Sequence, residues 1–316
     1  MKNKFIIILS AFLFIFGTIR LNAESMEKEF WGISENIAID LIKVNPKEFE
    51  ASPLYDFPSD LYKFFNSLKW NRVKLTKPYY ISIYEITQEQ WLDIMGEWPV
   101  NTYYSTLKYG SICLEYRNKY GVEVPPELIG LGDNYPVFWI SFDEAIEFCN
   151  RLSERLGLLA CYSRLDNGMI IWNHEANGFR LPTVAEWEYA AGCGTCKKRY
   201  PWGNRLNNKY AHVQLENNWP NPTIFHKIGE KLPNRFGLYD VVGNVMEWCW
   251  DPNGRCYGDV MVQGVYIDPC GDSNPEFYLD RNVRGGIHEG IHFQSQLGCV
   301  YERHWMYGLR IVKNAE

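Results

Sequence analysis

A histidine and glutamate motif near the C-terminus has the spacing of a zinc protease site. In "VRGGIHEGIHF", residues 283–293, His288, Glu289 and His292 form the pattern His-Glu-x-x-His. When this pattern lies on a helix, the two imidazoles are one turn apart and bind one zinc ion, and the glutamate activates the water on that zinc. The chemistry of these residue types at this spacing would be peptide hydrolysis.

The residues around the motif favour a strand over a helix. Gly290 lies inside the motif, and glycine costs about 1 kcal/mol relative to alanine in a helix interior. Ile287, Ile291 and Phe293 alternate along the segment with the period of a strand. On a strand the two histidines would be about 13 Å apart, and Glu289 would face away from both. We therefore interpret the zinc protease spacing as a coincidence.

The longer segment from His288 to Tyr307 is dense in side chains that form contacts at binding surfaces. Tyr, Trp, His and Gln combine amphipathic area with adaptable hydrogen bonds, as in antibody loops. The alternative is that single side chains here, such as His304 and Trp305, pack or face solvent. The predicted ligand-binding residues are His288, Glu289, Gly290, His292, Gln294, Gln296, Tyr301, Glu302, His304, Trp305 and Tyr307.

Three upstream segments repeat one design, in which an extended apolar piece leads into a hydroxyl N-cap and a short amphipathic helix. Tyr79, Ile81 and Ile83 alternate as a strand before the first of these helices. We expect the first two helices to end at Gly96 and Gly157. A Gln or Glu three residues after each N-cap completes a capping box. The pairs are Thr87 with Gln90, Ser141 with Glu144, and Thr183 with Glu186.

The chain changes character after residue 192. Gly, Pro, Asn and aromatic residues are dense there, apolar runs are short, and no helix signal exceeds about two turns. This predicts short strands on long, ordered loops. Since no low-complexity linker follows Ile37, residues 37–316 are predicted to form a single α+β domain. Residues 24–36 are a lead-in without an assignment.

The first 23 residues have the layout of a signal peptide. Lys2 and Lys4 precede an apolar run from Phe5 to Phe16 and a small-residue site that ends at Ala23. The run is shorter than the roughly 20 residues that a membrane span needs, and no later stretch is long and apolar enough. We expect an exported protein, extracellular, periplasmic or at the cell surface, with no membrane span.

Charge and cysteine content limit the partners and cofactors. Cleavage would remove Lys2, Lys4 and Arg20 and no acidic residue, which leaves 29 basic residues against 38 acidic ones. This balance argues against a nucleic-acid partner. The nine cysteines are an odd number, so at least one is free or pairs with another chain if the rest form disulfides. Cys193 and Cys196 lack the second pair that zinc would need, so we expect structural cysteines and no zinc.

Seven short motifs follow one another in a fixed order along the chain, from about Ile37 to Val312. They are "YEITQEQW", "PVFWISFDEAIEFC", "RLPTVAEWEYAA", "YPWGN", "NRFGLYDVVGNVMEW", "VRGG" and "GLRIV". In this order they resemble the formylglycine-generating enzyme (sulfatase-modifying factor) family. The resemblance implies a decorated C-type lectin fold with little regular secondary structure, in agreement with the α+β prediction.

The same resemblance implies a structural calcium site in "GLYDVVGNVMEW", residues 237–248. Carboxylates on a loop that permits tight turns suit a hard cation. The alternative is a carboxylate-capped turn without an ion. A second calcium site of the family has an asparagine where this chain has His212, so we expect that site to be absent. The calcium ligands that the resemblance implies are Asp240, Gly243, Val245 and Glu247.

The resemblance does not extend to the catalytic cysteines. The active enzymes oxidise a cysteine of a client sulfatase to formylglycine with a pair of cysteines and copper, and thiolates suit Cu(I) because both are soft. Counting from Gly285 and Gly286 places this pair at Gly290 and Ser295. Neither residue can bind copper as a thiolate, and Cys299 is alone nearby. We therefore expect no formylglycine generation and no bound copper.

The motifs "VRGG" and "GLRIV" enclose a segment whose content differs from the family's. This arrangement resembles the variable proteins diversified by retroelements, of the Treponema variable protein type, which display variable residues near the end of the same fold. It implies a non-catalytic recognition protein whose residues 287–307 bind a macromolecule, more readily a protein than a nucleic acid. The alternative hypothesis is a formylglycine-type oxidase or another metal-dependent oxidative enzyme on this fold.

Overall fold

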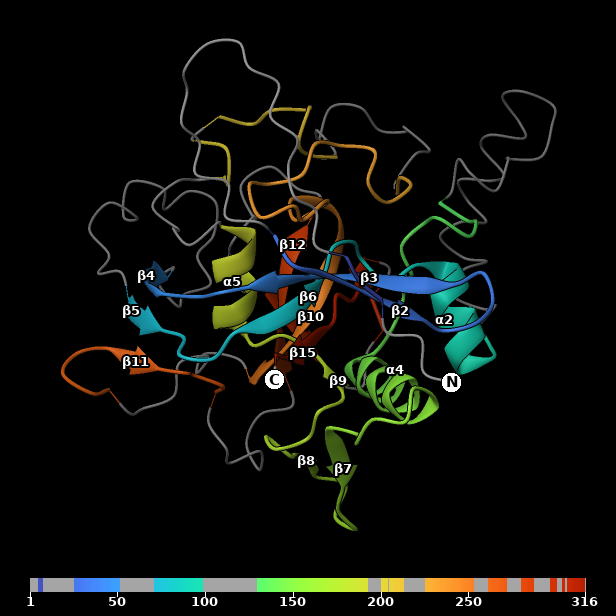
Figure 1. The fold of residues 1–316 in the computed structure, drawn as a ribbon, viewed down its shortest axis with the longest axis horizontal. Helices are drawn as coiled ribbons and strands as arrows, with labels where there is room; N and C mark the ends of the chain where they lie inside the picture. The colour runs from blue at the N-terminus through green and yellow to red at the C-terminus, as the bar shows by residue number, and fades with distance from the viewer. Residues whose placement is uncertain are drawn as a thin grey trace.

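Two β-sheets with helices at their sides form the core of the structure (Figure 1). The backbone alone is described for residues 5–7 and 296–299. No helix in the described part of the chain is long and apolar enough to cross a membrane. The computed structural model describes residues 26–51, 71–98, 130–192, 200–203, 205–212, 225–252, 261–271, 280–286, 303–304 and 306–315.

The larger sheet has six strands in the order β1-β2-β3-β6-β15-β9. All four residues of β6 are buried, because β3 and β15 pair with it on either side and its alternate side chains enter the core on both faces. The predicted lead-in contributes β2, so it belongs to this sheet. Cleavage of the expected signal peptide would remove β1 and leave β2 as the edge. The bounds are β1 Phe5–Ile7, β2 Lys28–Gly32, β3 Ala38–Val44, β6 Tyr79–Ser82, β9 Phe179–Arg180 and β15 Val312–Asn314.

The second sheet has four strands in the order β13-β12-β10-β14 and lies beside the predicted ligand-binding segment. All ten residues of β10 are buried, and it pairs antiparallel with β12 and parallel with β14. The predicted loop is therefore wrong from Gly243 onward. A strand buried on both faces reads as a continuous apolar run without alternation, so its period is hidden. The bounds are β10 Gly243–Pro252, β12 Asp280–Gly286, β13 Gln296–Cys299 and β14 Tyr307–Gly308.

The three predicted capping boxes are confirmed at helices α2 (Gln88–Met95), α4 (Phe142–Arg155) and α5 (Val184–Ala191). At α2, Thr87 Oγ1 accepts a hydrogen bond from Gln90 N at 3.2 Å, and Gln90 Oε1 accepts one from Thr87 N at 2.9 Å. Gly96 ends α2 with a φ of 80°, as predicted. These local signals mark where each helix starts.

The helices lie on different sides of the sheets (Figure 1). Helices α2 and α4 pack together, and the Trp91 and Phe148 rings stack between them with centroids 5.3 Å apart. Helix α5 lies on the other side and contacts β4 and β10. Two smaller sheets complete the described part. They contain β4 (Glu48–Ala51), β5 (Asn71–Lys74) and β11 (Tyr266–Ile267), and β7 (Tyr162–Arg164) with β8 (Ile170–Trp172).

The cysteine side chains that the structure describes form no disulfide. Cys149, Cys161 and Cys270 are free thiols. Cys149 and Cys249 are 0% exposed and pack in the two halves of the core. A buried free cysteine behaves as a small hydrophobic side chain, so the structural use of these cysteines is packing.

Candidate functional site

The predicted ligand-binding segment starts where β12 ends and returns as β13. The two strands are antiparallel, and Val283 opposite Gln296 is their pair nearest to the connection. Residues 287–295 make this connection and lie outside the described residues. The predicted ligand-binding residues that fall outside are His288, Glu289, Gly290, His292, Gln294, Tyr301, Glu302 and Trp305.

The other predicted ligand-binding residues occupy three different environments. Gln296 is the first residue of β13. His304 is half-buried, and its ring centroid lies 4.8 Å from that of Tyr307. Tyr307 is only 7% exposed, and its ring packs edge-on against Trp248 at 4.8 Å. The structure therefore places Tyr307 in the core, because its strand β14 pairs with β10, and not on a displayed surface.

Buried polar contacts hold strand β12 as it leads into the ligand-binding segment. Arg284 forms an ion pair of 3.1 Å with Glu188 of α5, and both side chains are 0% exposed. Asn282 Nδ2 donates to the carbonyl oxygens of Asp251 and Pro252 at 3.0 and 2.8 Å. Because these donors are buried away from water, moving the strand would leave them without hydrogen-bond partners. One end of the segment is therefore fixed by the core.

A second buried ion pair joins the end of the chain to β10. Arg310 Nε and Nη2 each donate to a different oxygen of Glu247 at 2.9 Å, and Trp187 Nε1 donates to the same carboxylate at 2.5 Å. Arg310 also donates to the carbonyl oxygens of Ser82 and Ile83, both at 2.8 Å. Burial opposes the charge of Arg310, but Glu247 outweighs it and raises the Arg310 pKa above its ordinary value. The pair joins the two sheets.

Glu85 and Asp240 add two more buried carboxyl groups beside Glu247. Asp240 Oδ2 accepts from Gly229 N at 2.7 Å, whereas its Oδ1 has no hydrogen-bond partner among the described residues. Glu85 accepts from Asn244 Nδ2 at 2.6 Å. Burial raises the pKa of Asp240 to about 6. Burial, followed by the charges of Asp240 and Glu247, raises the pKa of Glu85 well above its ordinary value.

These contacts test the calcium ligands that the family resemblance implies. Asp240, Gly243 and Asn244 have φ angles of 55°, 98° and 57°, so the expected tight backbone is present. Excess carboxylate charge and the open Asp240 Oδ1 suit a cation. Glu247 does not fit, because buried donors already occupy both of its oxygens. To bind calcium, Glu247 would have to give up a hydrogen bond from Arg310. The calcium site therefore stays a prediction.

Three of the described thiols, those of Cys149, Cys161 and Cys270, are unsuited to copper binding or nucleophilic chemistry. Burial raises the pKa values of Cys149 and Cys161, and it raises that of Cys270 to about 11. A raised pKa keeps a thiol protonated, whereas copper binding and nucleophilic attack need the thiolate. Gly290 and Ser295, where the resemblance would put the catalytic cysteines, lie outside the described residues.

Sequence reasoning missed one cluster of potential metal ligands. His226 and Glu230 lie beside His212, and one ligand atom from each residue falls within 4.8 Å of the others. The sequence marks His212 only as a departure from a calcium site of the family. The His-x-x-x-Glu spacing of His226 and Glu230 is a signal, but it does not reveal that His212, which follows "YPWGN" in the sequence, joins them.

Sequence comparisons identify relatives over most of this fold. The family model of the sulfatase-modifying factor enzyme 1-like domain matches residues 60–314. "Chaperone protein LppX" of Paenibacillus barcinonensis is 31% identical over 201 residues, which cover 55% of this chain and 62% of that protein. The formylglycine-generating enzyme of Thermomonospora curvata is 39% identical over 120 residues, which cover 34% of this chain and 38% of that protein. The matches span less than two thirds of either relative.

Solved structures share the fold across nearly the whole chain. Treponema denticola variable protein 1 has a TM-score of 0.65 at 22% identity and covers 91% of this chain and 99% of its own. PvdO from Pseudomonas aeruginosa has a TM-score of 0.58 at 16% identity and covers 90% of this chain and 98% of its own. The predicted fold, the C-type lectin fold in its formylglycine-generating-enzyme form, is confirmed. The chain belongs to the sulfatase-modifying factor enzyme 1-like family.

Proposed function

We propose that this chain is a non-catalytic, exported recognition protein that binds a macromolecular ligand, in the first place a protein. The single observation that carries the proposal is the pair Gly290 and Ser295 at the positions of the family's catalytic cysteines. Copper and thiol oxidation need soft thiolate ligands, which neither residue supplies. The family scaffold is kept while its reactive groups are absent.

The buried contacts of the scaffold support a displayed surface. Arg284 with Glu188 and Arg310 with Glu247 fix the strands on both sides of residues 287–307 through groups that lie outside the displayed positions. Side chains between these strands, other than buried ones such as Tyr307, can then change without loss of the core. Binding also costs less conformational entropy when the frame is already ordered.

The similar proteins support a binding role and a protein ligand. Treponema denticola variable protein 1, which shares the fold, is named for its variability. A curated relative carries the name of a chaperone, a class that acts by binding other proteins. The aromatic and histidine side chains of residues 288–305 suit such a surface, with aromatic groups at the centre and polar groups around them.

A display experiment tests the recognition surface. His288, His292, Gln294, Glu302 and Trp305 are randomised together, and the library is selected against a defined protein such as hen lysozyme. We expect folded clones that bind lysozyme and keep the parent's melting temperature within a few degrees. A matched library at buried residues of β10 should give unfolded clones. If randomising the displayed positions unfolds the chain as often as the β10 library does, the surface is structural and the proposal fails.

An oxidase assay tests the enzymatic alternative, which the similarity to formylglycine-generating enzymes keeps open. The purified chain is loaded with Cu(I) and given a cysteine peptide from a sulfatase, and oxygen consumption and aldehyde formation are measured. We expect neither above the buffer blank. Turnover of the peptide would overturn the non-catalytic assignment. A Gly290→Cys and Ser295→Cys double variant tests whether the missing thiolates are the reason, through a gain of Cu(I) binding.

Gene sequences from separate isolates test diversification. We expect substitutions to concentrate between His288 and Trp305, while Arg284, Gly285, Gly286 and Arg310 stay unchanged. Arg284 and Arg310 should stay unchanged because each forms a buried ion pair, whose loss would unfold the scaffold. An even spread of substitutions along the chain would remove the case for a diversified surface.

A further inference from the structure

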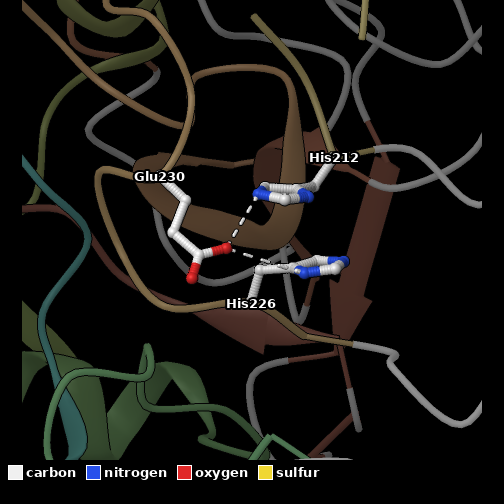
Figure 2. A group of neighbouring side chains, drawn as sticks. All are labelled: His212, His226 and Glu230. Carbon is white, nitrogen blue, oxygen red and sulfur yellow. Dashed lines mark ion pairs between the residues drawn. The ribbon is translucent and has the colours of Figure 1, made fainter. Parts of the chain in front are cut away.

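Two histidines and one glutamate meet beside the start of β10 (Figure 2). His212 Nε2 lies 3.5 Å from Glu230 Oε2, and His226 Nδ1 lies 3.9 Å from the same oxygen. The two imidazole rings stack face to face, with centroids 3.5 Å apart and 12° between their planes. The three side chains come from two loops and point toward one another.

His212 has an unsatisfied nitrogen that points to a missing ligand. Its side chain is 10% exposed, and its Nε2 has no hydrogen-bond partner among the described residues. A buried polar atom without a partner costs about 1–3 kcal/mol. The stack on His226 does not remove this cost, because ring faces do not satisfy an in-plane lone pair. A metal ion at Nε2 would.

The backbone of the cluster is held in place by residues other than its three side chains. Asn244 N donates to the carbonyl oxygen of His212 at 3.2 Å, and Asn244 Oδ1 accepts from His226 N at 3.0 Å. Asp240 Oδ2 accepts from the amide that precedes Glu230, at 2.7 Å. Outer contacts of this kind pre-orient metal ligands, so that binding need not order the loops.

Burial and a nearby lysine favour the neutral form of both imidazoles. Burial, followed by His226 and Lys231, lowers the pKa of His212 to about 3. Burial, followed by Lys231, lowers the pKa of His226 to about 4. Both rings are therefore neutral at neutral pH and offer lone pairs, which is the form that binds metals. The Glu230 carboxylate opposes the nearby Lys231 charge and supplies a negative ligand.

We propose that His212, His226 and Glu230 bind one divalent transition-metal ion, and that the donor set selects zinc(II). Two imidazoles and a carboxylate form known zinc sites with a fourth position open. Zinc bonds of about 2.0–2.1 Å in a tetrahedron separate the ligand atoms by about 3.4 Å. The separations of 3.5 and 3.9 Å are close to this value. Metal binding requires one of the stacked imidazoles to turn so that both in-plane lone pairs meet the ion, and the half-exposed Glu230 has room to follow.

The position of the site gives the metal a structural role. His212 forms a bridge with Gly243, and Gly243 lies opposite Gly286, the last residue of β12. Gly286 is also the residue before the connection 287–295. A bound ion would tie the His212 and His226 loops to each other beside the start of β10, which pairs with the end of β12. The proposal of a metal site does not depend on whether the recognition segment binds a protein.

A metal titration of the full chain tests the site. Chain stripped with EDTA is titrated with Zn²⁺ by calorimetry and with Co²⁺ by visible absorption. We expect one Zn²⁺ per chain and a cobalt spectrum without the thiolate charge-transfer band that cysteine ligands would give. Glu230→Gln and His226→Ala should each weaken Zn²⁺ binding at least tenfold. Glu230 is 47% exposed, so its substitution leaves folding intact, which the melting temperature of the metal-free variant checks.

Two matched variants separate this cluster from the chain's other histidines. His174→Ala removes a histidine that packs on Trp172, with ring centroids 4.1 Å apart, and should leave Zn²⁺ binding unchanged. The His288→Ala and His292→Ala double variant removes the His-Glu-x-x-His motif and should also bind Zn²⁺ normally. Loss of zinc in the double variant, or wild-type affinity in both Glu230→Gln and His226→Ala, would overturn the assignment. Displacement of Zn²⁺ by millimolar Ca²⁺ would equally contradict it.

Discussion

Arg310 engages both carboxylate oxygens of Glu247 inside the core, and neither side chain is more than 1% exposed. Arg310 lies two residues before β15 of the six-stranded sheet, whereas Glu247 is in the middle of β10 of the four-stranded sheet. One ion pair thus connects the six-stranded sheet to the four-stranded sheet. The predicted recognition segment, residues 287–307, lies between these two residues in the sequence.

Breaking this pair should destabilise the chain strongly. Glu247→Gln leaves the Arg310 charge buried without its counter-charge, and such a loss costs about 3–5 kcal/mol. Arg72→Ala is the matched control, since Arg72 pairs with Glu48 at the surface, where the two side chains are 55% and 44% exposed. It should cost less than about 1 kcal/mol. Urea unfolding measures both, and equal costs would contradict a structural role for the buried pair.

Gly243→Ala should be among the most damaging small substitutions. A Cβ at Gly243 would lie 1.9 Å from the carbonyl oxygen of His212, and the φ of 98° is unfavourable for any side chain. We expect loss of more than about 3 kcal/mol or failure to fold. Gly264→Ala, with a φ of 77° but no atom within 4 Å, should cost about 1 kcal/mol. Soluble yield and thermal melting compare the two, and a tolerated Gly243→Ala would show that the contact with His212 relaxes.

Asp240→Asn should stabilise the metal-free chain at high pH and not at low pH. Burial raises the folded-state pKa of Asp240 to about 6 from an ordinary 3.8, so the folded state holds its proton more tightly. Its cost to stability therefore grows as pH rises from 3.8 to about 6 and is constant above. The variant removes this cost, which is on the order of 2 kcal/mol at pH 8.

The same measurement in calcium reports on the implied calcium site. With EGTA present, Asp240→Asn should melt higher than the parent at pH 8 and equally at pH 4. If calcium binds through Asp240, adding it should raise the parent's melting temperature at pH 8 and reverse the order of the two proteins. If calcium leaves the parent's melting temperature unchanged, the implied calcium site at Asp240 is refuted.

Tyr307→Ala should unfold the chain more readily than His304→Ala. The Tyr307 ring is buried against Trp248, and removing a buried aromatic ring costs about 3–5 kcal/mol. His304 is half-buried, and its loss should cost about 1 kcal/mol or less. Chemical denaturation ranks them. If both substitutions lower the free energy of unfolding by a similarly small amount, Tyr307 is not a core residue and belongs to the displayed surface.

Local signals explain which elements the sequence predicts well. The capping boxes at Thr87, Ser141 and Thr183 join residues three apart, so they form whatever the rest of the chain does. Strand β10 was missed because its burial depends on β12 and β14, which are distant in sequence. Strand β2 in the lead-in was missed for the same reason, since β3 supplies its pairing.

The sequence by itself determined the family motifs, the helix starts and the absence of cysteines at Gly290 and Ser295, because residue types and short spacings carry that information. Only the tertiary structure decided which charges meet. It pairs Glu247 with Arg310, buries Tyr307, and brings His212 to His226 and Glu230. Contacts between distant segments depend on strand pairing and burial, which no local pattern encodes.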